Sequence, residues 1–182
     1  MADIKSPAKV MPVCGLLWSE GLKEDILAQM EREIGPVVLR SEIMPFVHTD
    51  YYEKEMGVGL ARQWCAFGTL VMPDALTGLK HRTNAMERVY LNDRAGRRVN
   101  IDPGLLSASS LILASTKNYA HRIYLGQGIY AEVTLIFRHQ EFAPLEWTYP
   151  DYREGSALDF FTRARSLLMD MLAREREGVT KE

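Results

Sequence analysis

The residues best suited to chemistry gather in the segment 120–137, where two alternating polar and apolar runs flank the sequence Gly-Gln-Gly. The alternation predicts two β-strands, and the glycines predict a tight turn between them. One face of this hairpin then carries Arg122, Tyr124, Tyr130, Glu132 and Thr134. An arginine can hold an anion through paired N–H donors, and a glutamate can move a proton or bind a metal. This polar face is the first candidate for a site.

The pairing within the hairpin depends on the length of its turn. A three-residue turn places Tyr124 opposite Tyr130 and Arg122 opposite Glu132. The other face is apolar and is expected to join the core; it consists of Ile123, Leu125, Ile129, Ala131, Val133, Leu135 and Phe137. The functional interpretation of the polar face is a pocket floor. The alternative is a solvated face with a cross-strand ion pair and a stacked tyrosine pair.

His121 lies on the opposite parity from Arg122, so it can join the polar face only from the edge of the strand. An imidazole has an ordinary pKa of about 6.5, which suits proton transfer, whereas a hydrogen-bonded structural role is the alternative. Lys117, His121 and Arg122 together would suit a phosphate or a carboxylate. The glycine-rich patterns of phosphate loops, G-x-x-x-x-G-K-[ST] and G-x-G-x-x-G, are absent from the sequence.

Carboxylates elsewhere could complete the site. Asp102 ends a predicted short strand and precedes Pro103-Gly104, a pattern typical of a turn, yet at a strand end it could also serve as a base or ligand. The irregular segment 45–59 contributes Thr49, Asp50 and Glu55. Asp102 and Glu132 with Asp50 or Glu55 would form a carboxylate cluster suited to Mg²⁺. Zinc is not expected, because no two histidines or cysteines stand at ligand spacing.

A locally basic stretch lies in the middle of the chain and consists of Lys80, His81, Arg82, Arg88, Arg94, Arg97 and Arg98. The favoured interpretation is the solvated surface of a helix. The alternative is an electrostatic patch for RNA, with Tyr124 and Tyr130 as stacking groups on a sheet. The aromatic signature of the common RNA-binding sheet domain is absent.

Periodicity indicates the elements that must position these groups. Strands are predicted at 10–17, 37–39, 64–72, 97–102 and 110–115, followed by the hairpin. Helices are predicted from Ser19 to Ile34, from Asp74 to Asn92, and after a capping pattern at Ser156 and Asp159. This order predicts an α+β, two-layer sandwich. Its sheet is expected to be mixed but mostly antiparallel, with helices on one face and a ferredoxin-like core extended by a C-terminal hairpin.

The bulk properties fit one domain of 182 residues with a net charge of −2, so nothing global points to nucleic acid or an anionic membrane. Residues 1–8 and 177–182 are expected to be flexible ends. Cys14 and Cys65 lie in apolar runs and are expected to be buried free thiols. The absence of an apolar leader or a membrane-length apolar run favours a cytoplasmic protein with no membrane partner.

Four stretches together resemble the bacterial domain-of-unknown-function 4416 family: F-V-H-T-D-Y-Y-E-K-E-M-G at 46–57, V-N-I-D-P-G at 99–104, L-A-S-T-K-N-Y-A-H-R-I-Y-L-G-Q-G-I-Y-A-E at 113–132, and W-T-Y-P-D-Y-R at 147–153. The resemblance spans nearly the whole chain and implies a small stand-alone bacterial protein without an established activity. Members are sometimes labelled GTP-binding, which this sequence does not support by the usual route, because it lacks both a P-loop and the Asn-Lys-x-Asp motif.

The family pattern places its polar motif residues on Thr49, Asp50, Tyr51, Tyr52, Glu55, Asn100, Asp102, Lys117, His121, Arg122, Tyr124, Tyr130, Glu132 and Asp151. We therefore expect Glu132, Asp102 and His121 as catalytic candidates. Ligand-binding candidates are Lys117, Arg122, Tyr124, Tyr130, Thr49, Asp50 and Glu55. The predicted ligand is a small anion, a nucleotide or a phosphorylated metabolite. The alternative is a non-enzymatic module that binds protein or RNA.

Overall fold

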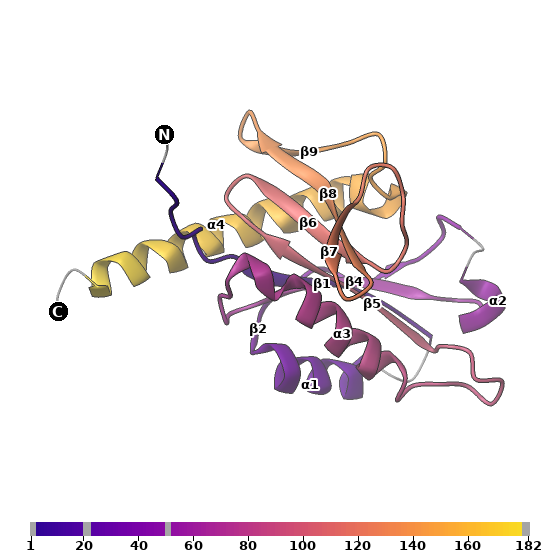
Figure 1. Ribbon diagram of the computed structural model, residues 1–182. Coiled ribbons are helices and arrows are strands. Elements are labelled where there is room, and N and C mark those ends of the chain that lie inside the picture. The colour runs from indigo at the N-terminus through magenta and orange to yellow at the C-terminus, as the bar shows by residue number, and fades with distance from the viewer. Residues whose placement is uncertain (1–2, 20–22, 50–51, 180–182) are drawn as a thin grey trace.

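A single antiparallel sheet organises the computed structural model, which describes residues 3–19, 23–49 and 52–179 (Figure 1). Within these residues the strands are β1 (Met11–Trp18), β2 (Val37–Arg40), β3 (Met44–Pro45), β4 (Ala61–Phe67), β5 (Val99–Leu106), β6 (Ser110–Ser115), β7 (Ile123–Gly126), β8 (Ile129–Arg138) and β9 (Glu141–Pro144). The helices are α1 (Lys23–Ile34), α2 (Glu53–Met56), α3 (Leu76–Glu87) and α4 (Gly155–Val179), with 3₁₀ turns η1 (Pro73–Ala75) and η2 (Pro150–Arg153).

The strand order is β2-β4-β1-β5-β6-β8-β7, with β3 beside β4 and β9 beside β8, and each of these neighbouring pairs is antiparallel. The β2-β4-β1-β5 part, with α1 and α3 as crossovers, has the split βαβ order of a ferredoxin-like core. Strands β6 to β9 extend it on the β5 side. The predicted α+β class, the mostly antiparallel sheet and the C-terminal extension are confirmed.

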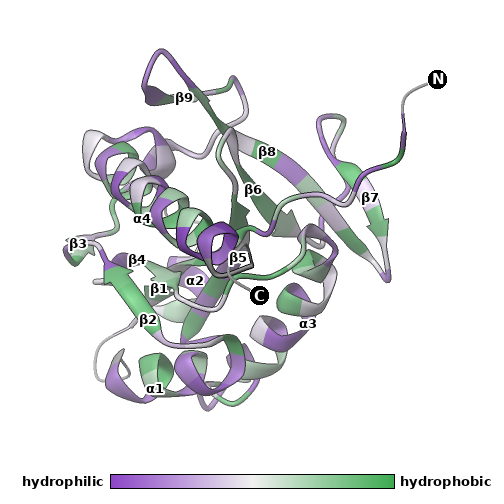
Figure 2. Cartoon of the chain, turned by 90° about the vertical axis from the view of Figure 1, so that its left-hand side faces the viewer, coloured by the Kyte–Doolittle hydropathy of each residue, from purple (hydrophilic) through white to green (hydrophobic). Residues whose placement is uncertain are grey.

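Helices cover the two faces of the sheet separately (Figure 2). As predicted, α1 and α3 share one face, where Ile26, Met30 and Leu79 pack with Cys14 and Leu16 of β1. On the opposite face, α4 packs Phe160, Phe161 and Leu168 against Met11, Val13 and Trp64. This third layer was not anticipated from the sequence. It is needed because all eight residues of β1 are buried, so both faces of the strand require cover.

Strand β5 does not end at Asp102, contrary to the turn predicted for Asp102-Pro103-Gly104. These three residues pair with Gly15, Cys14 and Val13 of β1 in the middle of the strand. Proline is tolerated because β6 begins to pair with β5 only at Gly104, so the missing N–H interrupts no ladder on that side. The third strand also differs from the expected 64–72, because β4 begins at Ala61 and therefore includes Arg62 and Gln63. Cys14 and Cys65 are buried free thiols, as predicted, and lie opposite each other in register.

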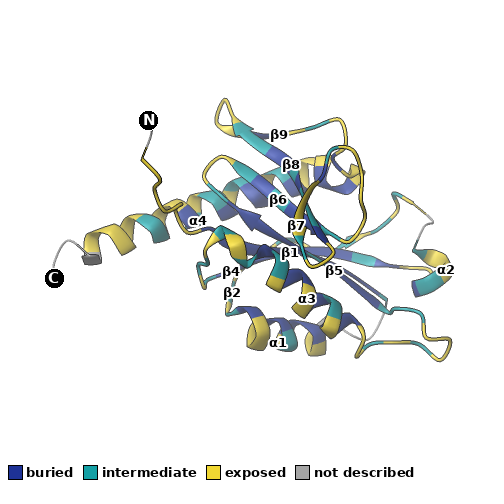
Figure 3. Cartoon of the chain, viewed as in Figure 1, coloured by how far each residue is buried: buried dark blue, intermediate teal, exposed yellow. Residues whose placement is uncertain are grey.

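The hairpin β7–β8 keeps the predicted pairing of Tyr124 with Tyr130. A bulge at Leu125 then brings Gly126 opposite Ile129, so Gly126 and not Leu125 pairs with that residue. The prediction that Ile123 and Leu125 join the core is wrong, since they are 69% and 43% exposed. Strand β7 is the edge of the sheet, and no helix of the described chain covers it (Figure 3).

Gly15 makes room for two polar side chains on the α4 face of the sheet. A Cβ placed there would clash with the Tyr152 hydroxyl and would lie 3.0 Å from Nη1 of Arg62. Gly15→Ala is therefore expected to lower the free energy of unfolding by about 1–3 kcal/mol through overpacking. Chemical denaturation measures this loss. Gly78→Ala is the control, because a Cβ at Gly78 would meet only Arg82 Nη1 at 3.7 Å and a helix gains from alanine. Equal stability of the Gly15→Ala and wild-type chains would contradict the close packing.

Candidate functional site

The sheet opens between β5 and β6. The two strands pair only over Gly104–Leu106 of β5 and Leu111–Leu113 of β6. Before Gly104 in the chain, the backbone of Ile101 is hydrogen-bonded by side chains of α3 and not by β6. Its N–H donates to Glu87 Oε1 at 2.7 Å, and its carbonyl accepts from Lys80 Nζ at 3.2 Å. Two buried charged side chains therefore line an opening in the sheet.

Two adjoining cavities lie around this opening. The first, of about 400 Å³, is lined by Tyr52, Lys80, Asn84, Glu87, Arg88, Arg97, Asn100, Asp102, Leu113, Ala114, Ser115, Thr116, Lys117, Glu132 and Tyr149. The second, of about 350 Å³, is lined by Leu17, Phe46, His48, Thr49, Tyr52, Arg62, Asp102, Lys117, Tyr119, Tyr149, Pro150 and Asp151. Tyr52, Asp102, Lys117 and Tyr149 line both. Asp102 and Lys117 therefore stand at the boundary between the cavities.

Arg62 of β4 is a buried cation beneath the second cavity. Its Nε donates to Asp151 Oδ2 at 2.8 Å, and its Nη2 forms an ion pair with the same oxygen. Its Nη1 lies 3.6 Å from Asp102 Oδ2 and has no hydrogen-bond partner among the described residues. The arginine side chain is only 6% exposed. One buried guanidinium thus faces two carboxylates and keeps an unused donor.

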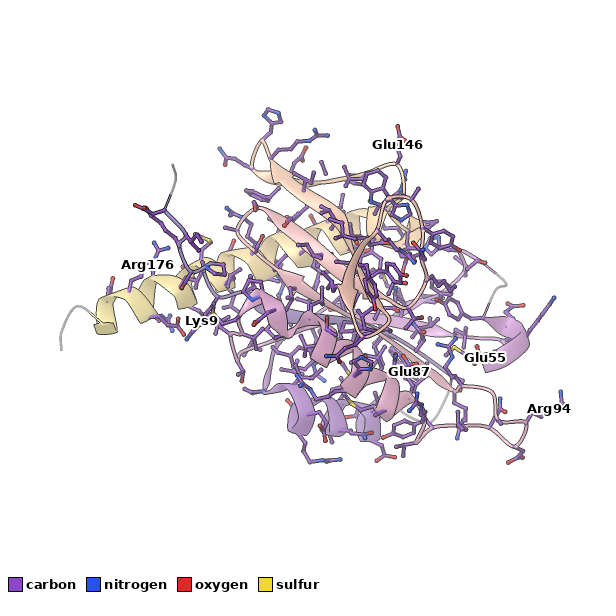
Figure 4. The ribbon with its side chains drawn as sticks, in the orientation of Figure 1. Lys9, Glu55, Glu87, Arg94, Glu146 and Arg176 are labelled. Carbon is purple, nitrogen blue, oxygen red and sulfur yellow. The ribbon has the colours of Figure 1, made fainter. Side chains whose placement is uncertain are left out.

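Arg97 connects the short helix α2 to Asp102. Its Nε and Nη2 each donate to a Glu55 oxygen at 2.8 Å, and its Nη1 donates to Asn100 Oδ1 at 2.8 Å. Asn100 Nδ2 in turn donates to Asp102 Oδ2 at 2.8 Å. Glu55 and Glu87 lie at this same end of the sheet, whereas Arg94 lies at the far end of the α3–β5 loop (Figure 4). Glu55 therefore acts on the site through Arg97 and lines neither cavity.

The two carboxylates bound by Arg97 are expected to have opposite effects on acid stability. Burial raises the pKa of Glu87 above its ordinary value of 4.5, whereas the hydrogen bonds from Arg97 lower the pKa of Glu55. Stability linked to Glu87 is present below pH 4.5 and is lost as pH rises through the raised pKa. Stability linked to Glu55 is present above pH 4.5 and is lost as pH falls through the lowered pKa.

Urea denaturation across this pH range measures both effects. Glu87→Gln is expected to remove the loss on the alkaline side, and Glu55→Gln the loss on the acid side. The two variants are controls for each other, because both remove one charge beside Arg97. Parallel pH profiles for the two variants would contradict the assignment.

Arg122 and Glu132 form the second charged centre, as the hairpin parity predicts. Arg122 Nε donates to Glu132 Oε2 at 2.7 Å, and both side chains are almost fully buried. The other guanidinium nitrogens donate to Ser115 Oγ at 2.7 Å, to the Lys117 carbonyl at 2.9 Å and to Tyr149 Oη at 2.7 Å. These hydrogen bonds hold Ser115, Lys117 and Tyr149, which line the first cavity. Arg122 itself does not line this cavity.

His121 reaches Glu132 from the turn before β7. Its Nε2 lies 3.3 Å from Glu132 Oε2, and Thr134 Oγ1 lies 3.3 Å from the other carboxylate oxygen. The imidazole stacks between two rings, with centroid distances of 6.0 Å to Tyr119 and 5.1 Å to Trp147. Burial, and then the charge of Glu132, raises the pKa of Tyr149. Glu132 is thus held by three partners and faces the first cavity.

The structure brings many of the predicted residues together. Asp102, Lys117 and Glu132 line the first cavity, and Thr49 lines the second with Asp102 and Lys117. Tyr124 and Tyr130 contact each other at 5.1 Å on the exposed edge and line neither cavity. Asp50 and Tyr51 lie outside the described residues. Among the residues that are described, no three His, Cys, Asp or Glu side chains gather as a metal-binding group.

Four important side chains were not selected from the sequence: Arg62, Lys80, Arg97 and Tyr149. The solvated-surface interpretation is wrong for Lys80, which is 6% exposed, and for the half-buried Arg97. Lys80 follows Leu76 at helical spacing, so its place on the inward face could have been found. Arg62 stands in a strand that is otherwise mostly apolar, and a buried arginine requires a partner.

The family model described as "Domain of unknown function (DUF4416)" matches residues 8–167. No curated protein and no solved structure matches the chain. Across the described parts of the chain, no helix combines the length and the apolar character needed to cross a membrane.

Proposed function

The chain belongs to the domain-of-unknown-function 4416 family, and from the geometry of its own side chains we propose that it binds a small anionic ligand, a nucleotide or a phosphorylated metabolite. One observation carries the proposal. The first cavity is lined by four cationic side chains, Lys80, Arg88, Arg97 and Lys117, and by three carboxylates, Glu87, Asp102 and Glu132. A concave site with an excess of positive charge favours an anion.

The cations differ in what they can offer a ligand. Arg97 is engaged by Glu55, Glu87 and Asn100, so it orients other groups. Lys80 uses one of its three donors on Ile101, and Arg88 is exposed at the cavity wall. Lys117 lines both cavities. In this proposal Lys80, Arg88 and Lys117 bind the anionic group, while Arg122 positions the carbonyl of Lys117.

Proton transfer would fall to two carboxylates that line the first cavity, Asp102 and Glu132. Asp102 is 28% exposed and lines both cavities, so it can contact a ligand and act as a general base. Glu132 accepts hydrogen bonds from the buried side chains of Arg122 and Thr134, and His121 Nε2 lies 3.3 Å from its Oε2. Mg²⁺ would enter with a phosphate, held by Asp102 and the phosphate oxygens, because Mg²⁺ often needs only one or two protein carboxylates.

Calorimetric titration with a panel of phosphorylated metabolites, with and without Mg²⁺, tests the proposal. Lys117→Gln is expected to weaken binding about tenfold or more, since a hydrogen bond to a charged group contributes about 1.5–3 kcal/mol. Arg138→Gln is the matched control, because it removes one exposed positive charge at the end of β8, outside both cavities. If no anion binds, or if both variants bind equally well, the proposal is wrong.

The alternative, a module that binds protein or RNA, is supported by the exposed hairpin edge. Tyr124 is 59% exposed and packs on Tyr130 in β8. Single-stranded RNA would stack on these rings and be retained in a salt-sensitive way. Tyr124→Ala would then abolish retention, whereas Lys117→Gln would leave the stacking contacts intact. Metabolite binding without RNA retention would exclude the RNA form of this alternative.

A further inference from the structure

The second cavity differs in chemistry from the first. Aromatic side chains form much of its lining, namely Phe46, His48, Tyr52, Tyr119 and Tyr149. We infer that this cavity binds a planar ring, so that the ligand has two parts: a ring in the second cavity and an anionic group in the first. This inference rests on the proposed function, because the first cavity must bind the anion.

One wall comes from the segment between β3 and β4. The ring of Phe46 packs edge-on against His48 at 5.7 Å and against Tyr52 at 5.9 Å, with interplanar angles of 74° and 72°. Edge-to-face contacts of this kind hold aromatic side chains in fixed orientations. His48 Nε2 also lies 3.0 Å from Glu154 Oε1, which connects this wall to the residue between η2 and α4.

The other wall is the end of an aromatic stack. Tyr119 packs nearly parallel to His121, which packs nearly parallel to Trp147, with interplanar angles of 12° and 11°. The Arg122 guanidinium lies 4.7 Å from the centroid of the Tyr119 ring. Tyr119 lines the cavity, whereas His121 and Trp147 do not. A flat ring bound there would meet an aromatic surface that is already held in place.

The Arg62 side chain beneath the cavity indicates which polar atoms a bound ring should carry. Nη1 of Arg62 is buried and has no hydrogen-bond partner among the residues the structure describes. Leaving such a donor unpaired is unfavourable, so a ligand acceptor that reaches it would bind more tightly. The ring is therefore expected to carry a carbonyl oxygen or an unprotonated ring nitrogen, as a nucleobase or another heteroaromatic ring does.

The two cavities can be filled by one molecule. They share Tyr52, Asp102, Lys117 and Tyr149, so a ligand that contacts these side chains can extend into both. Lys117 stands where the linker between ring and anion would pass. The inferred ligand class is a heteroaromatic ring joined to a phosphate or carboxylate.

Three matched probes separate the two parts: a nucleoside 5′-monophosphate, the same nucleoside, and ribose 5-phosphate. Calorimetric titration is expected to rank the monophosphate about tenfold or more above ribose 5-phosphate, because base stacking adds to the anion contacts. Tyr119→Ala is expected to remove that advantage and to leave the affinity for ribose 5-phosphate unchanged. Tyr124→Ala is the matched control, since this exposed tyrosine lines neither cavity. Tyr119→Phe should retain the advantage.

The outcomes distinguish the two proposals. If ribose 5-phosphate binds as tightly as all four common monophosphates, the ring site is wrong and the anion site stands. If Tyr119→Ala and Tyr124→Ala weaken monophosphate binding equally, the assigned wall is wrong. If none of the three probes binds and the wider metabolite panel fails too, both proposals fail.

Discussion

Replacing Arg62 with methionine is expected to lower the free energy of unfolding by about 3–5 kcal/mol. The guanidinium is buried and is the ion-pair partner of Asp151, whose side chain is 6% exposed. Without the arginine, the Asp151 carboxylate stays buried without its cation and Asp102 loses a neighbouring positive charge. Burying an uncompensated charge costs more than the lost contact itself. Chemical denaturation at neutral pH measures the loss.

Companion variants identify the cause. Arg62→Met combined with Asp151→Leu is expected to recover much of the stability, because removal of both charges leaves no buried ion at that place. Arg62→Lys keeps the charge but not the two contacts to one oxygen, and should lie between the single variant and the wild type. If the double variant is no more stable than Arg62→Met, loss of packing against Trp64 and Tyr152 is the main effect.

Reversing the charge at Arg122 is expected to have an effect of similar size. Arg122→Glu places two carboxylates together where the side chain of Glu132 is 1% exposed, and should destabilise the fold by about 3–5 kcal/mol. It also removes the donors to Ser115, Tyr149 and the Lys117 carbonyl. Glu132→Arg alone should cost a comparable amount, since two guanidinium groups then meet.

The double exchange, Arg122→Glu with Glu132→Arg, tests whether Arg122 stabilises the fold only through its ion pair with Glu132. A simple ion pair would recover nearly full stability, because the opposite charges meet again. We expect only partial recovery, because glutamate at position 122 cannot donate to Ser115, Tyr149 or the Lys117 carbonyl. Denaturation of the four chains in a double-mutant cycle gives the coupling energy. Full recovery would mean that Arg122 has no role in fixing the cavity walls.

Local pattern was sufficient to predict the contact between Arg122 and Glu132 and the order of the core strands. Alternation on β8 and the glycines before it predict the contact of Arg122 with Glu132, which depends only on neighbouring residues. The order of strands and helices predicts the split βαβ core, because few topologies suit that order. Asp102 and Lys117 are both candidates from the sequence, and the structure places both in the lining of the two cavities.

The predictions that are wrong concern features that depend on contacts between residues distant in the sequence. Asp102-Pro103-Gly104 has the composition of a turn, yet β1 pairs with it and holds it extended. The predicted strand begins only at Trp64, because the partners that allow Arg62 to be buried, Asp151 and Asp102, lie far away along the chain. The apolar residues of β7 predict a buried face, but whether a face is covered depends on where the helices pack. No local pattern carries that information.

The central position of β1 also has a consequence for synthesis. Its neighbours β4 and β5 end at Phe67 and Leu106, so β1 gains one strand neighbour when β4 is made and the other only when β5 is made. At about 5–20 residues per second, β1 waits roughly 5 to 20 s for β5 to be translated. At least one edge of this apolar strand is free throughout that interval and can pair with other nascent chains or bind chaperones. Chains truncated at residue 95 should therefore aggregate on release from the ribosome; if they stay soluble and monomeric, pairing with β5 is not what protects β1.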